Sequence, residues 1–588
     1  MAVFGKVLVA NRGEIAIRVF RTLRELGIGT VAVYSAVDRN ALHVAYADEA
    51  YLIGDGPPGE SYLNAERILE AAVRAGVDAI HPGYGFLAEN AGFARACAER
   101  DIVWIGPPPE AIEAMGSKIE ARDRMRAAGV PIIPGVTEAV ESAEEVRRLG
   151  DELGWPIAIK ASAGGGGKGL KVVRDPGEVE RAFESARREG EAYFSDSAVY
   201  VERYLEDPRH VEVQVLADTH GNVIHLGERD CTIQRRHQKL VEETPSPAVD
   251  PELRARIGAI AVEAARAVGY QSAGTIEGLL SREGEYFFLE MNTRIQVEHT
   301  VTELVTGLDL VREQILVAAG EPLSVRQEDV QLHGHALECR INAEDVANGF
   351  LPAPGTITRY HEPSGPGVRV DSGVVAGSEI SPLYDPLIAK LVVHGVDREH
   401  ARRRMLRALD EFVIEGVKTL IGFHKALLAH PCFVDGETCH GLVESELLAA
   451  RAAELENGRG VRQPAETAAA VREAVRSVEV DGRRFEVRVL RPEPAYAELG
   501  RRRRERARDA GAGGAGLDAV VSPMQGTVLA VEVADGDEVE AGQILCIVEA
   551  MKMENEVHAH RAGRVAELSV APGQPVKTGQ VICIVTGD

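Results

Sequence analysis

The stretch "YFFLEMNTRIQVEHTVTE" (residues 286–303) joins a run of apolar residues to a dense group of polar ones. Its first part has the length and the aromatic content of a β-strand. Glu290 and Asn292 are two residues apart, so a strand places both on one face. The same alternation continues through Arg294, Gln296 and Glu298. An extended chain would aim these three side chains to one side, so the stretch predicts a strand that carries a polar binding site.

Oxygen ligands for a metal ion are available on this strand and on a segment before it. Glu277, in "GTIEGLL", supplies a second carboxylate beside that of Glu290. Two carboxylates and the amide oxygen of Asn292 suit Mg²⁺, a hard cation that prefers oxygen ligands and substrate phosphates. The alternative is a pair of exposed acids at strand ends. Arg294 beside Glu298 is either a plain salt bridge or a holder for a small anion next to a base. Further candidate partners for an anion are Lys239, in "RRHQKLVEE", and Arg340, in "ECRINAED".

A glycine-rich segment upstream is suited to phosphate binding. "KASAGGGGKGLKVV" (160–173) follows the strand-like run "PIAIK". Gly164–Gly167 let the backbone approach phosphate oxygens closely. Lys160 and Lys168 can neutralise phosphate charge from either side. The segment is not a Walker loop, because Lys168 is followed by glycine instead of Ser or Thr; the alternative is a flexible surface loop.

The N-terminal region alternates between strand-like and helix-like segments. The strand-like runs are "KVLVA" (6–10), "TVAVYS" (30–35) and "VDAIHPGYG" (77–85). Between the first two, "EIAIRVFRTLRELG" has apolar residues at a helical period. Alternation of this kind with short loops predicts a parallel sheet with helices on its faces.

The C-terminal region contains an internal repeat. Residues that recur 37 positions later include Gly526, Gly536 and Gly542, matched by Gly563, Gly573 and Gly579. Two similar β-rich halves predict a small quasi-symmetric sandwich or flattened barrel. Lys552 lies in the connection between the halves, where a hairpin turn would project it into solvent; the alternative is an ordinary solvated lysine. The preceding "RRRRERARDAGAGGAG" is a linker by composition, and "SVEVDGRRFEVRVL" before it is strand-like.

Composition limits the possible partners. The chain of 588 residues has a formal net charge of −25, which argues against non-specific binding to nucleic acid or anionic lipid. Its seven cysteines show no paired spacing, so neither a disulfide framework nor a zinc site is predicted, and Cys432 and Cys439 are expected to be buried thiols. The N-terminus has no signal-peptide pattern, and no apolar run approaches the ~20 residues that span a bilayer. We expect a soluble, cytoplasmic protein.

The motif around Lys552 resembles a known attachment site. "AMKM" (550–553), placed between the repeat halves, closely resembles the biotin-acceptor motif of biotin carboxyl carrier domains, and "SPMQGTV" (522–528) fits the same family. Related lipoyl domains usually carry Asp-Lys-Ala at this point, so the methionines favour biotin. This resemblance covers about residues 518–587.

The order of motifs in the rest of the chain resembles biotin carboxylase, an ATP-grasp enzyme. The motifs are "GSKIEAR", "KASAGGGGKG", "VERYLEDPRHVEVQV", "ERDCTIQRRHQKLVEE", "EMNTRIQVEHTVTE" and "ECRINAED". The resemblance runs from "LVANRGEIAIR" to about residue 446. Together with the C-terminal lysine, the whole chain is similar to the biotin-containing α subunits of acyl-CoA carboxylases.

This resemblance implies a multidomain fold. We expect an α/β Rossmann-like N-terminal domain, an α+β ATP-grasp domain with a flexible lid, and a C-terminal all-β biotinyl/lipoyl-like flattened barrel. The expected boundaries are 1–115 for the biotin carboxylase N-terminal domain, 116–317 for the ATP-grasp domain with its lid at about 135–204, 318–446 for the biotin carboxylase C-terminal domain, 447–517 for a linker and possible subunit-docking segment, and 518–588 for the biotin carboxyl carrier domain.

The implied activity is that of a ligase that carboxylates a biotin group held covalently on Lys552. ATP and bicarbonate would react through carboxyphosphate, with biotin, ATP and Mg²⁺ or Mn²⁺ as cofactors. The carboxybiotin would pass to a separate carboxyltransferase β subunit, in an oligomeric complex, that carboxylates acetyl- or propionyl-CoA, and biotin protein ligase would attach the biotin. We expect no nucleic acid or membrane partner. Two alternatives stay open: another ATP-grasp ligase, joining a carboxylate to an amine, with a lipoyl-like tail, or a non-catalytic carrier and scaffold subunit.

The resemblance also implies roles for individual residues. The expected contacts to ATP are Lys118, Lys160, His210, Gln234 and His237, with Glu202 and Leu205 lining the adenine pocket and Gly166 and Gly167 in the lid. The expected metal ligands are Glu277, Glu290 and Asn292. The expected bicarbonate ligands are Lys239, Arg294, Gln296, Val297 and Arg340. Glu298 would act as the base and Arg340 would stabilise the biotin enolate, which makes Glu298, Arg294, Arg340 and Lys239 the catalytic set.

Two positions depart from the family pattern. Gly278 stands where the family usually has a bulky apolar residue after the metal-binding glutamate. Leu170 stands where methionine is common near adenine. Both departures concern local packing and leave the chemistry unchanged.

Overall fold

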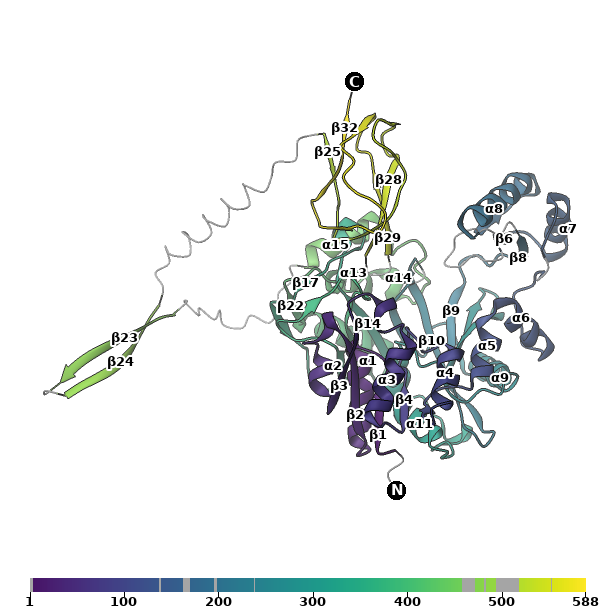
Figure 1. Ribbon diagram of the computed structural model, residues 1–588. Coiled ribbons are helices and arrows are strands. Elements are labelled where there is room, and N and C mark those ends of the chain that lie inside the picture. The colour runs from purple at the N-terminus through teal and green to yellow at the C-terminus, as the bar shows by residue number, and fades with distance from the viewer. Residues whose placement is uncertain are drawn as a thin grey trace. The chain divides into compact units, whose positions relative to one another are not determined.

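The computed structural model describes residues 4–136, 139–161, 170–194, 198–236, 238–456, 471–480, 483–492, 518–550 and 553–587. The chain forms two compact units, Met1–Asn457 and Gly458–Asp588. Figure 1 shows the helices and strands of both units, with the C-terminal strands in yellow. Each unit is described by itself.

The first unit begins with a five-stranded parallel sheet of order β3-β2-β1-β4-β5. Its strands are β1 (Lys6–Val9), β2 (Gly29–Ser35), β3 (Glu49–Gly54), β4 (Ala79–His81) and β5 (Val103–Trp104). Its helices are α1 (Gly13–Glu25), α2 (Leu42–Tyr46), α3 (Ala65–Ala75) and α4 (Ala91–Ala98). Val7 and Val9 pack in one core with α1, whereas Leu8 packs in a second core with α3. Helices therefore cover both faces of the sheet, which confirms the expected doubly wound α/β fold.

A large antiparallel sheet forms the centre of the first unit. Its eight strands have the order β13-β12-β9-β10-β11-β14-β21-β19. They are β9 (Arg209–Ala217), β10 (Val223–Arg235), β11 (Gln238–Thr244), β12 (Ser272–Leu280), β13 (Tyr286–Asn292), β14 (His335–Asn342), β19 (Val368–Ser372) and β21 (Leu387–Gly395). The sheet continues without a break past the domain boundary expected at residue 317, because β11 pairs with β14. Residues of both parts can therefore meet on one face.

Helices and short strand pairs surround this sheet. The helices are α5 (Pro109–Gly116), α6 (Lys118–Ala127), α9 (Pro251–Arg266), α10 (His299–Thr306), α11 (Leu310–Ala318), α12 (Arg398–Glu411), α13 (Ile421–Leu428), α14 (Pro431–Val434) and α15 (Glu446–Glu456). The strand pairs are β15 (Glu344–Asp345) with β16 (Leu351–Pro352), β17 (Gly355–Thr356) with β20 (Glu379–Ile380), and β18 (Arg359–His361) with β22 (Val413–Glu415). An amphipathic face accounts for α9, whose buried residues include Ile257 and Ala261.

The expected lid is a small lobe with a core of its own. A three-stranded antiparallel sheet of order β7-β6-β8 carries two helices. The elements are β6 (Ile157–Ala161), β7 (Leu170–Val173), β8 (Val199–Arg203), α7 (Ala143–Leu153) and α8 (Val179–Phe194). Val146, Ile159 and Val201 belong to a hydrophobic cluster separate from those under the large sheet. A lobe that keeps its own core can move as a body, as a lid must.

The second unit confirms the internal repeat. Two four-stranded sheets have the orders β25-β32-β30-β27 and β29-β28-β26-β31. Their strands are β25 (Ala519–Val521), β26 (Gly526–Val531), β27 (Glu538–Val539), β28 (Ile544–Ala550), β29 (Met553–His558), β30 (Gly563–Ala566), β31 (Pro575–Val576) and β32 (Val581–Thr586). A Cβ added to Gly526 would lie 2.3 Å from the carbonyl oxygen of Glu549, and one added to Gly563 would lie 2.3 Å from that of Thr586. The two halves thus need glycine for the same close strand contact.

The second unit also contains a hairpin, which precedes the two sheets in the chain. β23 (Val471–Val480) pairs with β24 (Arg483–Pro492) in an antiparallel ladder. This confirms the strand prediction for "SVEVDGRRFEVRVL". The arginine-rich linker that follows lies outside the described residues.

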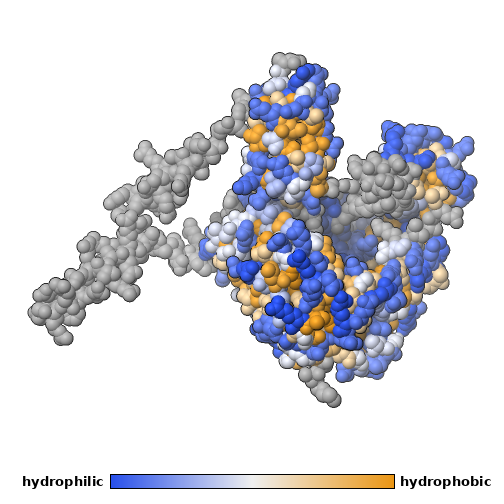
Figure 2. Space-filling view, viewed as in Figure 1, coloured by the Kyte–Doolittle hydropathy of each residue, from blue (hydrophilic) through white to orange (hydrophobic). Residues whose placement is uncertain are grey.

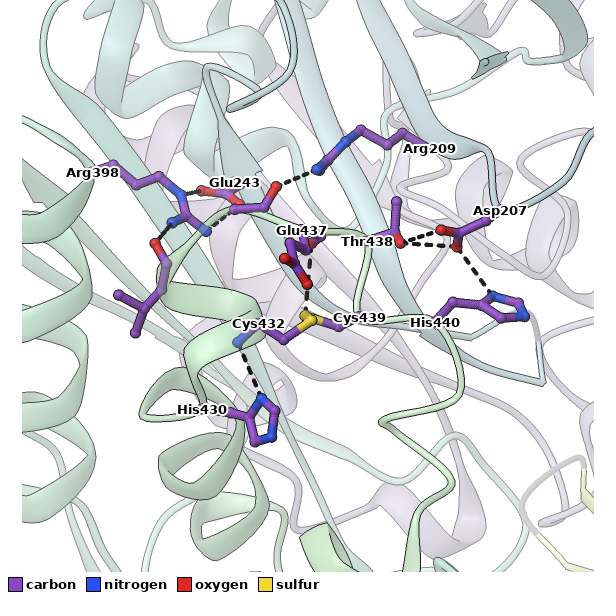
Figure 3. The surroundings of a disulfide bond; sticks show 12 residues. Asp207, Arg209, Glu243, Arg398, His430, Cys432, Glu437, Thr438, Cys439 and His440 are labelled. Carbon is purple, nitrogen blue, oxygen red and sulfur yellow. Dashed lines mark hydrogen bonds and ion pairs between the residues drawn. A yellow bond between two sulfur atoms is a disulfide. The ribbon is translucent and has the colours of Figure 1, made fainter. Parts of the chain in front are cut away.

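The two cysteines expected to be buried thiols instead form a disulfide. Cys432 and Cys439 are joined, with their Cα atoms 5.7 Å apart (Figure 3). The expectation was wrong because the chain turns back after α14 and brings the two residues within disulfide distance, which their spacing in the sequence does not reveal. The other five cysteines are free and buried.

Hydrophilic and hydrophobic residues are interspersed over the face of the first unit that Figure 2 shows. No helix in the described part of the chain has both the length and the hydropathy of a membrane span.

A tyrosine explains why position 278 is glycine. Gly278 lies on β12 diagonally across from Tyr286 on β13. A Cβ added at Gly278 would lie 2.3 Å from Cζ of Tyr286. Tyr286 is buried and occupies the space that a larger residue at position 278 would need. Leu170 is the other position that departs from the family pattern. Its side chain lies outside the described part of the chain.

We predict that Gly278→Leu lowers the free energy of unfolding of the first unit by about 1–3 kcal/mol, because overpacking forces the neighbouring ring to move. In a Tyr286→Ala background the same change should cost much less. Urea unfolding followed by circular dichroism measures both, with Gly59→Ala as the control because its Cβ would meet nothing within 4 Å. Equal costs in the two backgrounds would contradict the packing explanation.

Candidate active site

A buried lysine lies at the centre of the candidate site. Nζ of Lys239, on β11, is 2.8 Å from Oε1 of Glu277 and 2.6 Å from Oε1 of Glu298, and it also contacts Glu212. These carboxylates come from β12, from the turn before α10 and from β9. Burial alone would lower the pKa of Lys239, but the three carboxylates outweigh it and raise that pKa well above its usual value. The lysine is therefore a fixed positive charge.

Glu298 lies between two cations. Its Oε1 meets Lys239, and its Oε2 accepts a hydrogen bond of 2.9 Å from Nη2 of Arg340, on β14. Nε of Arg340 donates to Oε1 of Glu242 at 2.6 Å. Burial alone would raise the pKa of Glu298, but Lys239, Arg340 and Arg229 hold it well below its usual value. Glu298 is ionised at neutral pH and can accept a proton.

The alternation expected to aim Arg294, Gln296 and Glu298 to one side does not continue. β13 ends at Asn292, and Glu298 is the N-cap residue of α10. The expected strand therefore ends before the three residues, although Gln296 and Glu298 still reach one network through Glu277 and Lys239. Polar residues with backbone turns between them imitate a strand pattern, and sequence alone does not separate the two cases.

Glu277 collects hydrogen bonds from several expected site residues. Its Oε1 accepts from Nδ2 of Asn292 at 2.8 Å and from Nε2 of Gln296 at 2.6 Å. Its Oε2 is 2.9 Å from Nε2 of His210. Burial would raise the pKa of Glu277, but Lys239 and His210 outweigh it and lower that pKa. Glu277 thus stays ionised despite being buried.

The expected metal ligands fit a hard cation. Glu277 and Glu290 are paired across β12 and β13, and Asn292 follows on the second strand. A cavity of about 220 Å³ lies beside two of the three, because Glu290 and Asn292 line it together with Thr293 and Glu89 among others. The carboxylate of Glu277, next to the carboxylate and amide at the cavity edge, completes the oxygen donor set that Mg²⁺ and Mn²⁺ prefer.

A second group of donors in the described part of the chain overlaps this one. Ligand atoms of His210, Glu212 and Glu277 lie within 4.8 Å of one another. The ammonium of Lys239 already contacts both carboxylates of this group. Its positive charge opposes a cation at that point. The set with Glu290 shares Glu277, but its other two members line the cavity, which makes it the better metal site.

Arg294 extends the network to the N-terminal part of the chain. Its Nη2 donates to Oδ1 of Asn292 at 2.7 Å, and its Nε donates to Oε2 of Glu89 at 3.0 Å. Glu89 also accepts from the backbone N–H of Thr293 at 3.1 Å. The sequence analysis missed Glu89, because it stands alone among residues before α4 with no motif around it.

Arg229 is a second residue that the sequence analysis missed. It is fully buried on β10, and its guanidinium donates to Oε1 of Glu212 at 2.6 Å and to Oε1 of Gln296 at 2.5 Å. It also donates to Thr275 and Thr302. Arg229 fixes the Gln296 amide so that its NH₂ group points to Glu277. The only signal in the sequence is a run of three charged residues, Glu228–Asp230, inside the strand "IHLGERDCTIQ".

The residues expected to contact the nucleotide lie along one path from the lid to the large sheet. Lys160 on β6 contacts Glu202 on β8, which also accepts from Nη1 of Arg122 at 3.2 Å. Leu205 is buried against Ile133 and Phe287 at the point where the lid joins the sheet. Further along, Nε2 of Gln234 donates to the carbonyl of Cys231 at 2.8 Å. The other expected residues, Lys552, Gly166, Gly167, His237 and the side chain of Lys118, lie outside the described part of the chain.

The disulfide loop supports this path. Oγ1 of Thr438 donates to Asp207 at 2.8 Å, and Arg209 donates to the carbonyl of Gly436. Figure 3 shows Thr438, His440 and Asp207 side by side next to the Cys432–Cys439 bond. Asp207 and Arg209 stand between Leu205 and His210 in the chain. The loop after α14 therefore holds the segment that carries two expected nucleotide contacts.

Four family models match the chain. They are "Biotin carboxylase, N-terminal domain" at residues 3–112, "Carbamoyl-phosphate synthase L chain, ATP binding domain" at 117–326, "Biotin carboxylase C-terminal domain" at 338–445 and "Biotin-requiring enzyme" at 518–585.

Curated relatives match over most of the chain. A pyruvate carboxylase component from Methanothermobacter thermautotrophicus is 57% identical over 74% of this chain and 88% of its own length. Biotin carboxylase of Nostoc sp. is 54% identical over 75% of this chain and 99% of its own. The biotin-dependent acyl-coenzyme A carboxylase alpha3 subunit of Mycobacterium leprae is 45% identical over 95% of this chain and 94% of its own.

A solved structure shares the fold of the first unit. The biotin carboxylase domain dimer of Hydrogenobacter thermophilus 2-oxoglutarate carboxylase, in complex with MgADP, ADP and bicarbonate, is 50% identical with a TM-score of 0.70. The match covers 76% of this chain and 98% of that one.

We predict that Glu298→Gln lowers bicarbonate-dependent ATP hydrolysis by about 10²–10⁴-fold, the usual loss when a general base is removed. The amide keeps the size of the side chain but cannot accept the proton. Phosphate release measures the loss, and nucleotide affinity should change little. The control is Glu283→Gln, an exposed glutamate; a Glu298→Gln variant with undiminished hydrolysis would show that Glu298 is not the base.

Proposed function

We propose that this chain, which belongs to the biotin carboxylase family, is the biotin-bearing α subunit of an acyl-CoA carboxylase. The family is established by the matches to the biotin carboxylase N- and C-terminal domain models and to curated biotin carboxylases. It catalyses the ATP-dependent carboxylation of biotin with bicarbonate. One observation carries the proposal for the whole subunit. The acyl-coenzyme A carboxylase alpha3 relative aligns over 95% of this chain, linker and carrier included.

Bicarbonate is a poor electrophile, and phosphorylation by ATP activates it. We assign bicarbonate binding to Lys239, Arg294, Gln296, Arg340 and the backbone of Val297. Glu298 takes the proton of bicarbonate, and the freed oxygen attacks the γ-phosphorus, which gives carboxyphosphate and ADP. The geometry supports this assignment, because Glu298 is held ionised between Lys239 and Arg340 at 2.6 and 2.9 Å.

Phosphoryl transfer requires positive groups that neutralise the negative charge of the ATP phosphates. Lys118 and Lys160 would hold the ATP phosphates, and Gly166 and Gly167 would close over them. Glu202, Leu205, His210, Gln234 and His237 would hold the rest of the nucleotide. Glu277, Glu290 and Asn292 would hold Mg²⁺ or Mn²⁺, which when bound neutralises charge on the phosphate oxygens.

The second half of the reaction uses Arg340. Carboxyphosphate breaks into carbon dioxide and phosphate, the phosphate takes the proton of the ureido nitrogen, and that nitrogen then attacks carbon dioxide to give carboxybiotin. Arg340 presents its planar guanidinium to the ureido oxygen of biotin, where negative charge then develops. Both carboxylates that Arg340 now contacts, Glu242 and Glu298, keep the guanidinium oriented on the site. Closure of the lid excludes water, which would otherwise consume carboxyphosphate.

The carrier domain takes the carboxyl group to a partner. Lys552 is the proposed attachment point for biotin, and biotin protein ligase is the proposed modifying enzyme. A carboxyltransferase β subunit would receive the carboxyl group and pass it to acetyl- or propionyl-CoA. The hairpin of β23 and β24 is a candidate docking segment, because it stands between the carboxylase part and the carrier. A cytoplasmic location fits the five free cysteines, with the Cys432–Cys439 disulfide as an exception.

A second candidate acceptor is a 2-oxo acid. The relative with 57% identity belongs to a pyruvate carboxylase, and the solved relative comes from a 2-oxoglutarate carboxylase. Both matches cover about three quarters of this chain, 74% and 76%, whereas the acyl-CoA carboxylase relative covers 95%. Purification with the native partner, followed by assays with an acyl-CoA panel and with 2-oxo acids, decides between the acceptors.

We predict that the chain from its native host carries one biotin, on Lys552, and that Lys552→Arg carries none. Intact mass and peptide mass spectrometry measure this. The matched control is Lys577→Arg, an exposed lysine in the second half of the carrier repeat. A lipoyl adduct on Lys552 would favour the rival ATP-grasp ligase, and an unmodified Lys552 would contradict the proposed carrier role.

Deleting residues 475–490 should abolish co-purification with the β subunit, because it removes most of the β23–β24 hairpin. The matched control deletes residues 500–515 in the arginine-rich linker and should leave the complex intact. Size-exclusion chromatography of the co-expressed subunits measures both. An unchanged complex after deletion of 475–490 would reject the docking role.

A further inference from the structure

A fully buried lysine stands beside the site without touching the reacting groups. Lys390, in the middle of β21, is 0% exposed, and its neighbours Ala389 and Leu391 are buried apolar residues. It is paired across the sheet with Arg340 on β14. Residues directly opposite each other share a face, and like charges there are unfavourable. A buried charge opposite another cation is unfavourable in a sheet. Such exceptions to local rules are most often found at functional sites.

The contacts of Lys390 join three parts of the first unit. Its Nζ donates to the carbonyl oxygen of Val297 at 3.1 Å and is 3.2 Å from Oε2 of Glu14. It is 3.8 Å from Oδ2 of Asp371, its cross-strand partner on β19. Glu14 belongs to the first turn of α1, in the N-terminal sheet region, and is itself buried. One ammonium therefore ties α1 and β19 to the turn that precedes α10.

The contacted carbonyl belongs to the peptide that leads into the proposed base. The carbonyl carbon of Val297 is bonded to the nitrogen of Glu298, and the peptide is planar, so a hold on the oxygen fixes the whole group. Arg340 holds the carboxylate of the same residue at 2.9 Å. Two neighbouring cations on one sheet face thus hold Glu298 at its backbone and at its side chain.

Counter-charges are divided between the two cations. Glu242 and Glu298 face Arg340, whereas Glu14 and Asp371 face Lys390. Burying a charge costs several kcal/mol even when it is paired. Replacing Lys390 by an apolar residue would avoid this cost, and adjacent positions of β21 are apolar. A lysine at this place therefore points to a purpose beyond stability.

We infer that Lys390 is a positioning residue for the removal of the proton from bicarbonate: by holding the Val297–Glu298 peptide it sets the place of the base. The inference rests on the role of Glu298 in the proposed function. A base that is misplaced by about 1 Å loses about 10²-fold in rate. The position of Glu298 would then depend on α1, β19 and β21 together, and not only on its own turn.

The test uses a variant in which no charge is left uncompensated. Lys390→Met alone would leave Glu14 buried without its cation and could prevent folding. The variant therefore combines Lys390→Met with Glu14→Gln, which removes both charges, while Asp371 keeps its ion pair with Arg369 at 2.7 Å. The matched control is Lys425→Met, because Lys425 is also buried and paired, with Asp410 at 2.6 Å, but does not contact the Glu298 turn. All proteins are full-length and biotinylated, and circular dichroism and thermal unfolding establish that they are folded.

Steady-state ATP hydrolysis with varied bicarbonate and varied ATP then gives separate constants. In the double variant kcat for bicarbonate-dependent hydrolysis should fall about 10–100-fold, while KM for ATP stays within about twofold of the wild type. Lys425→Met should leave both constants unchanged. A folded double variant with wild-type kcat would overturn the inference. So would a loss in which kcat, KM for ATP and melting temperature all change together, since that pattern is a general structural defect. Absence of bicarbonate-dependent hydrolysis in the wild type would refute the proposed function, and the inference with it.

Discussion

A carboxylate held ionised in a buried place is the constraint on which the first unit depends. Glu298 is 2% exposed, yet the role we propose for it needs a free negative charge. Lys239 and Arg340 supply the opposing charges, and these cations in turn need Glu212, Glu277 and Glu242. Removing one partner of such a buried set typically costs about 3–5 kcal/mol, so no member is independently replaceable. The balance of charge thus links residues that are far apart in the sequence.

The large antiparallel sheet makes this balance possible. Lys239, Glu277 and Arg340 stand on β11, β12 and β14, and the paired strands fix their spacing. Strands place side chains more reproducibly than loops do, which suits a site in which small displacements change rates strongly. The lid has its own core, so it can carry Lys160 without disturbing the sheet. The architecture therefore separates the site on the sheet from the lobe that we propose as the lid.

The sequence predicted the elements more completely than the contacts. The doubly wound N-terminal sheet, the strand before Asn292 and the C-terminal repeat follow from periodicity, because side-chain alternation and strand pairing obey the same rules everywhere. The strand expected to carry Arg294, Gln296 and Glu298 does not form, since β13 ends at Asn292 and period-two polarity does not require a strand. Arg229 and Glu89 could not be found, because their partners are distant in the sequence and no local motif marks them. The Cys432–Cys439 disulfide was missed for a different reason: the two residues are close in the sequence, but their pairing depends on how the chain turns after α14.

Isotope transfer tests the central account most directly. The biotinylated chain is incubated with labelled bicarbonate, ATP and Mg²⁺, without any carboxyltransferase partner, and the peptide that contains Lys552 is examined for label. The account predicts a labelled carboxyl group on that peptide, dependent on ATP. Hydrolysis of ATP with no label on the carrier, or label that forms without ATP, would contradict it.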